Sequence, residues 1–318
     1  MAKRDKDSLF SSHVSRREML KTSITVATAA AFSAGVCSLP QTLFAAPAKP
    51  ILSVATGANY KNIVIDAIGA LGGMKKFISG GERVVVKPNI AWDRPPELGA
   101  NVHPTVVKTI VEMCLDAGAK QIKLFDRTCD DARLTYESSG IKAAIATIKD
   151  PRVKLEFFDE NEWKFVELDI PKGKKLKKWS FYKDAVNADF FINVPIAKSH
   201  GSTTLSLSMK NLMGIIGGVR GEIHWEIHQK LADLASAFKS HLIILDATRI
   251  VTKRGPSTGD KNNVKVLNKV IAGTNQVAVD SYGATLFGKT GSEIGYIKNA
   301  YDMGLGEIDM SKVKIIGS

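Results

Sequence analysis

The residues best suited to chemistry lie around positions 198–211. Lys198 and His200 flank a serine just after an apolar run, and Lys210 and Asn211 follow a hydroxyl-rich stretch. Ammonium groups and backbone N–H groups at a strand-to-helix turn favour anions. If the protein is an enzyme, which the sequence leaves open, we expect His200 to be a general acid–base because its unperturbed pKa is near neutrality. Lys198 and Lys210 would then stabilise developing negative charge. The alternative is a set of solvated polar residues that cap a helix.

Other polar residues also follow apolar, β-branched runs. Because the carboxyl ends of parallel strands meet at one edge of a sheet, we expect these side chains to share one pocket. The predicted ligand-binding residues are Lys87, Asn89, His103, Asn211 and Asp246. No Walker-type or dinucleotide glycine fingerprint follows a strand, which disfavours nucleotide binding by a standard loop.

A histidine pair suggests a metal. His224 and His228 are four residues apart on a predicted helix, and this spacing would place both imidazoles on one face. His200 or His103, with Asp126 or Asp246, would have to complete the site. Such ligands suit divalent zinc, manganese, nickel or iron without selecting one. The alternative is an ordinary polar helix face.

The three cysteines, Cys37, Cys114 and Cys129, have no C-x-x-C spacing. They are too few for a four-cysteine iron–sulfur cluster within this chain alone. A disulfide between Cys114 and Cys129 is conceivable in an oxidising compartment, but the sequence does not show that the two residues approach each other.

The elements that must position these residues alternate along the chain. The expected strands are 51–55, 83–87, 121–125, 190–194, 241–245 and 270–272, and the expected helices are 59–71, 105–117, 141–147, 224–238 and 277–287. Alternating strands and helices predict an α/β fold with a mainly parallel twisted sheet flanked by helices. Two-residue alternation over 153–179, around the basic turn 174–178, predicts a small antiparallel excursion.

Composition restricts the class of protein. The 318 residues are 44% hydrophobic and 24% charged, which excludes a disordered, collagenous or disulfide-scaffold chain. A formal net charge of +12 suits anionic ligands, nucleic acid or an acidic surface without choosing among them.

The first 48 residues have the plan of a signal peptide, with a basic start, an alanine-rich apolar stretch and small residues before a cleavage site. Within them, Ser15-Arg-Arg-Glu-Met-Leu-Lys21 resembles the twin-arginine motif. We expect residues 1–48 to be a twin-arginine signal peptide and 49–318 a single α/β domain. The protein would then be exported folded by the twin-arginine machinery to the periplasm or another extracytoplasmic space, with no membrane span after cleavage and no nucleic acid as a partner. The alternative is an uncleaved membrane anchor.

Several motifs together resemble the domain-of-unknown-function 362 family. They are Lys87-Pro-Asn89, Lys198-x-His200, Ser208-Met-Lys-Asn-Leu-Met-Gly214, the segment 224–233, Asp246 and Ala272-Gly-Thr-Asn-Gln-Val-Ala-Val-Asp280. The resemblance covers about residues 84–318 and implies an α/β fold. Some members carry a cysteine-rich ferredoxin-like module, which this sequence lacks. Where the family often has Glu-Gly-x-Gly-Pro, this chain has Lys253-Arg-Gly-Pro256, and this exchange of an acid for cations favours an anionic ligand.

Two functions follow as hypotheses. The first is an exported protein that binds a small anionic ligand, a carboxylate or a phosphate, in a pocket lined by Lys, His and Asn, with a divalent metal as a candidate cofactor. The second is a non-catalytic accessory protein of the cell envelope that binds an acidic partner through its basic surface, including Lys174, Lys175, Lys177 and Lys178.

Overall fold

The computed structural model describes residues 49–317. The predicted twin-arginine signal peptide, residues 1–48, lies outside the described residues. The strands of the described part are β1 (Ile51–Thr56), β2 (Arg83–Pro88), β3 (Gln121–Leu124), β4 (Val153–Leu155), β5 (Phe165–Asp169), β6 (Lys178–Tyr182), β7 (Phe190–Val194), β8 (Ile196–His200), β9 (Thr204–Ser206), β10 (Leu242–Val251), β11 (Val264–Gly273) and β12 (Lys314–Gly317). The α-helices are α1 (Tyr60–Ala70), α2 (Pro104–Asp116), α3 (Ala132–Ser138), α4 (Ile141–Ala146), α5 (Lys183–Val186), α6 (Ser208–Asn211), α7 (Ile227–Ala237), α8 (Gln276–Thr285) and α9 (Gly295–Asp302).

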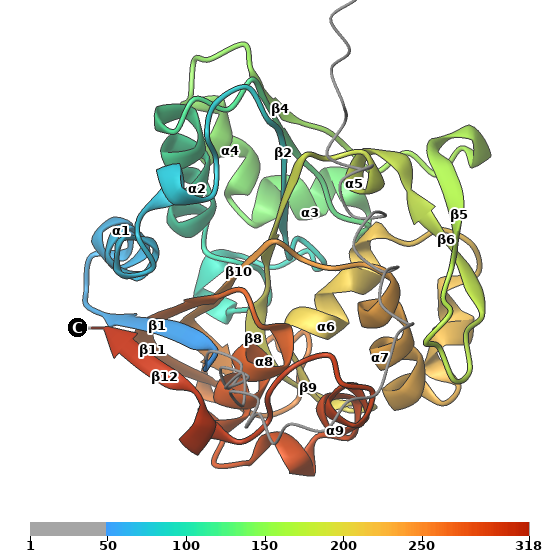
Figure 1. The fold of residues 1–318 in the computed structure, drawn as a ribbon. Helices are drawn as coiled ribbons and strands as arrows, with labels where there is room; N and C mark the ends of the chain where they lie inside the picture. Colours follow the sequence, from blue (N-terminus) through green and yellow to red (C-terminus); the bar gives the residue numbers. More distant parts are fainter. Residues whose placement is uncertain (1–48, 318) are drawn as a thin grey trace, which may run out of the picture. The chain divides into compact units, whose positions relative to one another are not determined.

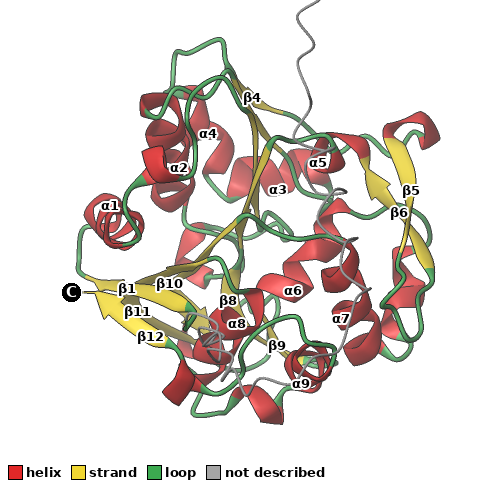
Figure 2. Cartoon of the chain, in the orientation of Figure 1, coloured by secondary structure: helices red, strands yellow, loops and turns green. Residues whose placement is uncertain are grey.

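One large mixed sheet organises these elements. Its strand order is β12-β1-β11-β10-β7-β2-β3-β4, with β8 beside β10 and β9 beside β8. Most neighbours run parallel, and the antiparallel pairs are β1–β11, β10–β11 and β8–β9. The expected α/β fold with a mainly parallel sheet flanked by helices is confirmed (Figures 1 and 2).

Successive side chains of a strand point to opposite faces of the sheet, and both faces of this sheet are buried. In β2, Val85 packs into one apolar cluster, and Val84 and Val86 pack into the other. The first cluster includes residues of α7, α8 and α9, whereas the second includes residues of α1, α2 and α4. Figure 1 shows these two groups of helices on opposite sides of the sheet.

The predicted antiparallel excursion is present as the two-stranded sheet β5–β6. The turn between these strands is fixed by a buried carboxylate: the backbone N–H groups of Lys174, Lys175 and Leu176 donate to Asp233. The early part of the excursion differs from the expectation, since β4 pairs parallel with β3 in the main sheet.

Two further expectations were wrong. The segment 196–200 is not a loop but strand β8, which pairs with β10 and β9. Strand β10 also continues to Val251, so Asp246 lies inside a strand instead of ending one.

Every helix within residues 49–317 is too short or too polar to cross a membrane.

Candidate functional site

A cavity of about 250 Å³ lies where β2, β3 and β8 end, beside the last residues of α6. This is the edge at which α/β sheets commonly bind ligands. Its lining residues are Lys87, Asn89, Ala91, Trp92, Asp126, Arg127, Cys129, Lys198, His200, Ser206, Lys210, Asn211, Met213, Gly214, Arg220, His224 and Pro256.

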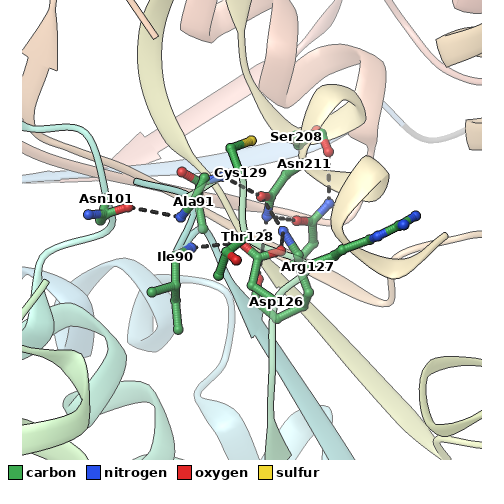
Figure 3. Close-up of polar contacts among 12 residues, drawn as sticks. Ile90, Ala91, Asn101, Asp126, Arg127, Thr128, Cys129, Ser208 and Asn211 are labelled. Atoms are coloured by element: carbon green, nitrogen blue, oxygen red, sulfur yellow. Dashed lines mark hydrogen bonds and ion pairs between the residues drawn. The ribbon is translucent and has the colours of Figure 1, made fainter. Parts of the chain in front are cut away.

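A buried ion pair between Lys87 and Asp126 lines the cavity. Nζ of Lys87 lies 2.7 Å from Oδ1 of Asp126, and the two side chains are only 1% and 2% exposed. The Ile90 backbone N–H donates to Asp126 Oδ2 at 2.7 Å (Figure 3). Burial lowers the pKa of Lys87 and raises the pKa of Asp126, while their mutual attraction opposes both shifts. Because each charge lies beside the other, the pair adds almost no net charge to the site.

Asn211 connects this pair to the rest of the cavity. Its Oδ1 accepts hydrogen bonds from Lys87 Nζ and from Asn89 Nδ2, and its own Nδ2 donates to Asn193 Oδ1 at 2.7 Å. Helix α6, which carries Lys210 and Asn211, is held at its start because the N–H groups of Ser208 and Met209 donate to Asp280. The asparagine network therefore fixes side chains from several elements.

Gly214 allows the backbone to approach the ion pair closely. A Cβ atom at this position would overlap Asp126 Oδ1 and lie too close to Nζ of Lys87. A glycine is thus required here by space and not by its backbone angles.

Two further lysines face the cavity with lowered pKa values. Lys198 is buried, and its Nζ donates to Asn89 Oδ1 at 2.9 Å and to the Ala100 carbonyl at 2.7 Å. Burial lowers its pKa to about 7. Lys210 is half-buried, its Nζ lies 3.0 Å from the Met213 sulfur, and burial lowers its pKa to about 8.

Two arginines and an exposed cysteine complete the cavity. Arg127 pairs with Glu160, with Nε 3.0 Å from Oε1. Arg220 donates to the carbonyls of Arg127 and Thr128, and its Nη2 lies 3.8 Å from the sulfur of Cys129. These contacts hold the guanidinium of Arg220 in place without neutralising it.

Charge pairing within the cavity is incomplete. The lining cations are Lys87, Arg127, Lys198, Lys210 and Arg220. Asp126 and Glu160 pair with Lys87 and Arg127. Within residues 49–317, no carboxylate lies at ion-pair distance from the other three cations.

Most of the predicted site residues line this cavity. They are Lys87, Asn89, Lys198, His200, Lys210, Asn211 and His224. His200 does not have the expected pKa, because burial and the nearby Lys210 and Lys198 lower it to about 3. Its imidazole is therefore neutral near pH 7. Since Nδ1 accepts a hydrogen bond from the Ser202 N–H, the proton resides on Nε2 and His200 can donate there.

Two predicted ligand-binding residues lie elsewhere. Asp246 is fully buried in β10 and accepts hydrogen bonds from the N–H groups of His103 and Thr248. His103 caps α2 through Nδ1, and its ring packs edge-on against Tyr60. The two residues therefore hold the start of α2 beside β10 and do not line the cavity.

The prediction that His224 and His228 share one helix face was also wrong. His224 ends a 3₁₀ helix, Arg220–His224, and Glu226 adopts a left-handed conformation before α7 begins at Ile227. His224 lines the cavity, whereas His228 lies against Gly295 and is stacked 6.4 Å from Tyr296. The pair consequently shares no helix face. Within the described ranges, no group of three or more His, Cys, Asp and Glu side chains is placed to hold a metal.

The contribution of the segment after β3 was not predicted from the sequence. Asp126 was considered only as a metal ligand, and Arg127 and Arg220 were not identified. The polar run that follows the third strand was the available signal, since polar residues after other apolar runs identified Lys87 and Lys198.

Cys114 and Cys129 do not form a disulfide. Both are free, with Cys114 buried and Cys129 exposed.

Comparison with known proteins identifies the family. Residues 84–285 match the domain of unknown function DUF362. The chain belongs to this family. A thylakoid-associated protein of Synechocystis sp. is 27% identical over 210 residues, which are 62% of this chain and 61% of that protein. The match therefore leaves more than a third of the relative uncovered.

Solved structures provide more distant similarities. The lactate racemase apoprotein from Thermoanaerobacterium thermosaccharolyticum is 14% identical with a TM-score of 0.47, and the comparison covers 75% of this chain and 57% of that one. A Thermotoga maritima protein is 13% identical with a TM-score of 0.41, over 77% and 58% of the two chains.

Proposed function

We propose that the cavity binds a small anionic ligand, a carboxylate or a phosphate. The observation that carries this proposal is that two cations, Lys210 and Arg220, share one cavity with Lys198 and have no carboxylate partner within the described residues. Unpaired cations in a partly enclosed site gain most from an incoming anion, because charge-assisted hydrogen bonds are stronger than neutral ones. The cavity volume of about 250 Å³ suits a small molecule.

The cavity residues differ in what they would do for this ligand. Lys210 and Arg220 would bind the anion directly, and Nε2 of His200 would donate a neutral hydrogen bond. The pair of Lys87 and Asp126 would keep Asn211 and Asn89 in place without competing for the anion.

Calorimetric titration with phosphate and with acetate tests the proposal. A Lys210→Gln variant should bind the preferred anion about 10- to 100-fold more weakly, which corresponds to the roughly 1.5–3 kcal/mol of a charged hydrogen bond. Lys298→Gln is the matched control, since Lys298 is an exposed lysine on α9 paired with Asp302. Absence of binding for both anions and a range of related carboxylates and phosphates, or equal binding by the two variants, would exclude this function.

We also propose that the protein acts outside the cytoplasm. The support is the sequence of residues 1–48, with Arg16 and Arg17 in a twin-arginine context. Fractionation of cells that express the full chain, compared with an Arg16→Lys/Arg17→Lys variant, tests the route. Equal export of both forms would refute it.

The basic turn is a weaker basis for function. Lys175 and Lys178 are paired with Glu226 and Glu167, so part of the positive charge expected there is neutralised. Binding of an acidic partner through this turn remains the second hypothesis, and the paired lysines favour the cavity over it.

A further inference from the structure

The hydrogen bonds of Lys198 fit a neutral amine better than an ammonium ion. An ammonium group has three N–H donors, whereas a neutral amine has two donors and one lone pair. In the described part of the chain, Nζ of Lys198 has two acceptors, Asn89 Oδ1 and the Ala100 carbonyl. Two donors satisfy both acceptors and leave the lone pair for a molecule in the cavity.

The surroundings of Lys198 favour the same protonation state. The residue is 1% exposed, and Lys210 and Lys87 place further positive charge nearby. Burial is the largest effect and disfavours an ammonium group, as do the two lysines, whereas Cys129 and Asp126 oppose the shift. Burial prevails and lowers the pKa to about 7, so a large fraction of Lys198 is neutral at neutral pH. A desolvated lysine beside other cations is an activated nucleophile.

The neighbouring groups define which electrophile would fit. Lys210 and Arg220 are cations available to a carboxylate, and His200 presents an N–H donor at Nε2. A carbonyl oxygen can accept that hydrogen bond. A molecule with a carboxylate next to a carbonyl group would use all of these features.

We propose that the site binds 2-oxo carboxylates and that Lys198 condenses with their carbonyl carbon to form an imine. This inference rests on the proposed anion binding, and it adds the substrate class and the nucleophile.

The condensation balances without an oxidant or reductant. The lone pair of Nζ attacks the carbonyl carbon, a C–N bond forms, and the carbonyl π electrons move to oxygen, which takes up a proton. The oxygen then takes up a second proton and leaves as water while the C=N bond forms. Both protons of this water come from Nζ, so the step consumes no external acid.

Reductive trapping tests this step. The protein is incubated with pyruvate and cyanoborohydride, and modified peptides are located by mass spectrometry. We expect one reduced adduct per chain, on Lys198, and none with propionate, which has the carboxylate but no carbonyl. The Lys298→Arg control should retain the adduct, and Lys198→Arg should lose it.

A second variant separates misfolding from loss of the nucleophile. Lys210→Gln keeps Lys198 but weakens carboxylate binding, so the adduct on Lys198 should form with about tenfold lower yield at low pyruvate and recover at high pyruvate. Stabilisation of the protein by both pyruvate and propionate without an adduct would overturn the imine and leave anion binding standing. An adduct found on Lys210 or scattered over exposed lysines would equally overturn it.

Discussion

Replacing Lys198 by methionine should change how the stability of the protein depends on pH. Methionine is unbranched and apolar, so it can fill a similar volume without a charge. In the wild type, the pKa of Lys198 moves from 10.5 to about 7 on folding, mainly because the group is buried. At about 1.4 kcal/mol for each pKa unit, the charged form is disfavoured by roughly 5 kcal/mol.

The direction in which the free energy of unfolding changes with pH depends on which state binds more protons. Between the folded pKa near 7 and the unfolded pKa of 10.5, the unfolded chain holds a proton on Lys198 that the folded protein has released. The unfolded state binds more protons, so the free energy of unfolding rises with pH in this window. From about pH 7 to about pH 9, this residue should add about 2 kcal/mol of stability to the wild type.

Urea unfolding of both proteins at these two pH values measures the effect. The methionine variant leaves Asn89 Oδ1 and the Ala100 carbonyl without a donor, and this cost, about 1–3 kcal/mol for each group, is nearly independent of pH. The difference between the proteins should therefore change by about 2 kcal/mol in favour of the wild type as the pH rises. Parallel pH profiles for the two proteins would refute a lowered pKa for Lys198.

Three other predictions concern the same cavity. Anion affinity should fall as the pH rises from about 7 to about 9, because the two lysines with lowered pKa values lose their protons, and calorimetry that shows constant affinity would contradict this. Gly214→Ala should lower the free energy of unfolding by about 2–4 kcal/mol through overlap with the buried ion pair. Gly201→Ala, where a Cβ meets open space, should be nearly neutral, and equal costs would disprove the steric argument. Cys129 should react with iodoacetamide in the native protein and Cys114 only after unfolding, whereas equal rates would disprove their different burial.

The fold was largely predictable because several strands of the main sheet, such as β2, contain continuous β-branched runs. The segment 84–86 is apolar on both faces, which is typical of a strand covered by helices on both sides. Asp246 misled the prediction, since a charged residue usually marks the end of such a strand. Here its carboxylate accepts hydrogen bonds from the N–H groups of His103 and Thr248. The contact with His103 joins residues far apart in the sequence, so no local pattern reveals it.

The site was predictable where a polar residue directly follows the apolar run of a strand. Lys87 follows the run 84–86 within β2, and Lys198 lies in β8, the strand that comes after the apolar β7. The histidine pair failed for a conformational reason. Helical spacing implies a shared face only if the helix is continuous, and the left-handed backbone of Glu226, with φ of 56°, interrupts it. Arg220 was missed because its position at the cavity depends on backbone carbonyls of residues more than ninety positions earlier in the chain.

A crystal structure of the protein soaked with its preferred anion tests the central claim most directly. We expect the anion in the cavity, with its oxygens within hydrogen-bond distance of Lys210 Nζ and the Arg220 guanidinium, and with the pair of Lys87 and Asp126 intact. An anion bound at the basic turn 174–178 while the cavity holds only water would contradict the claim.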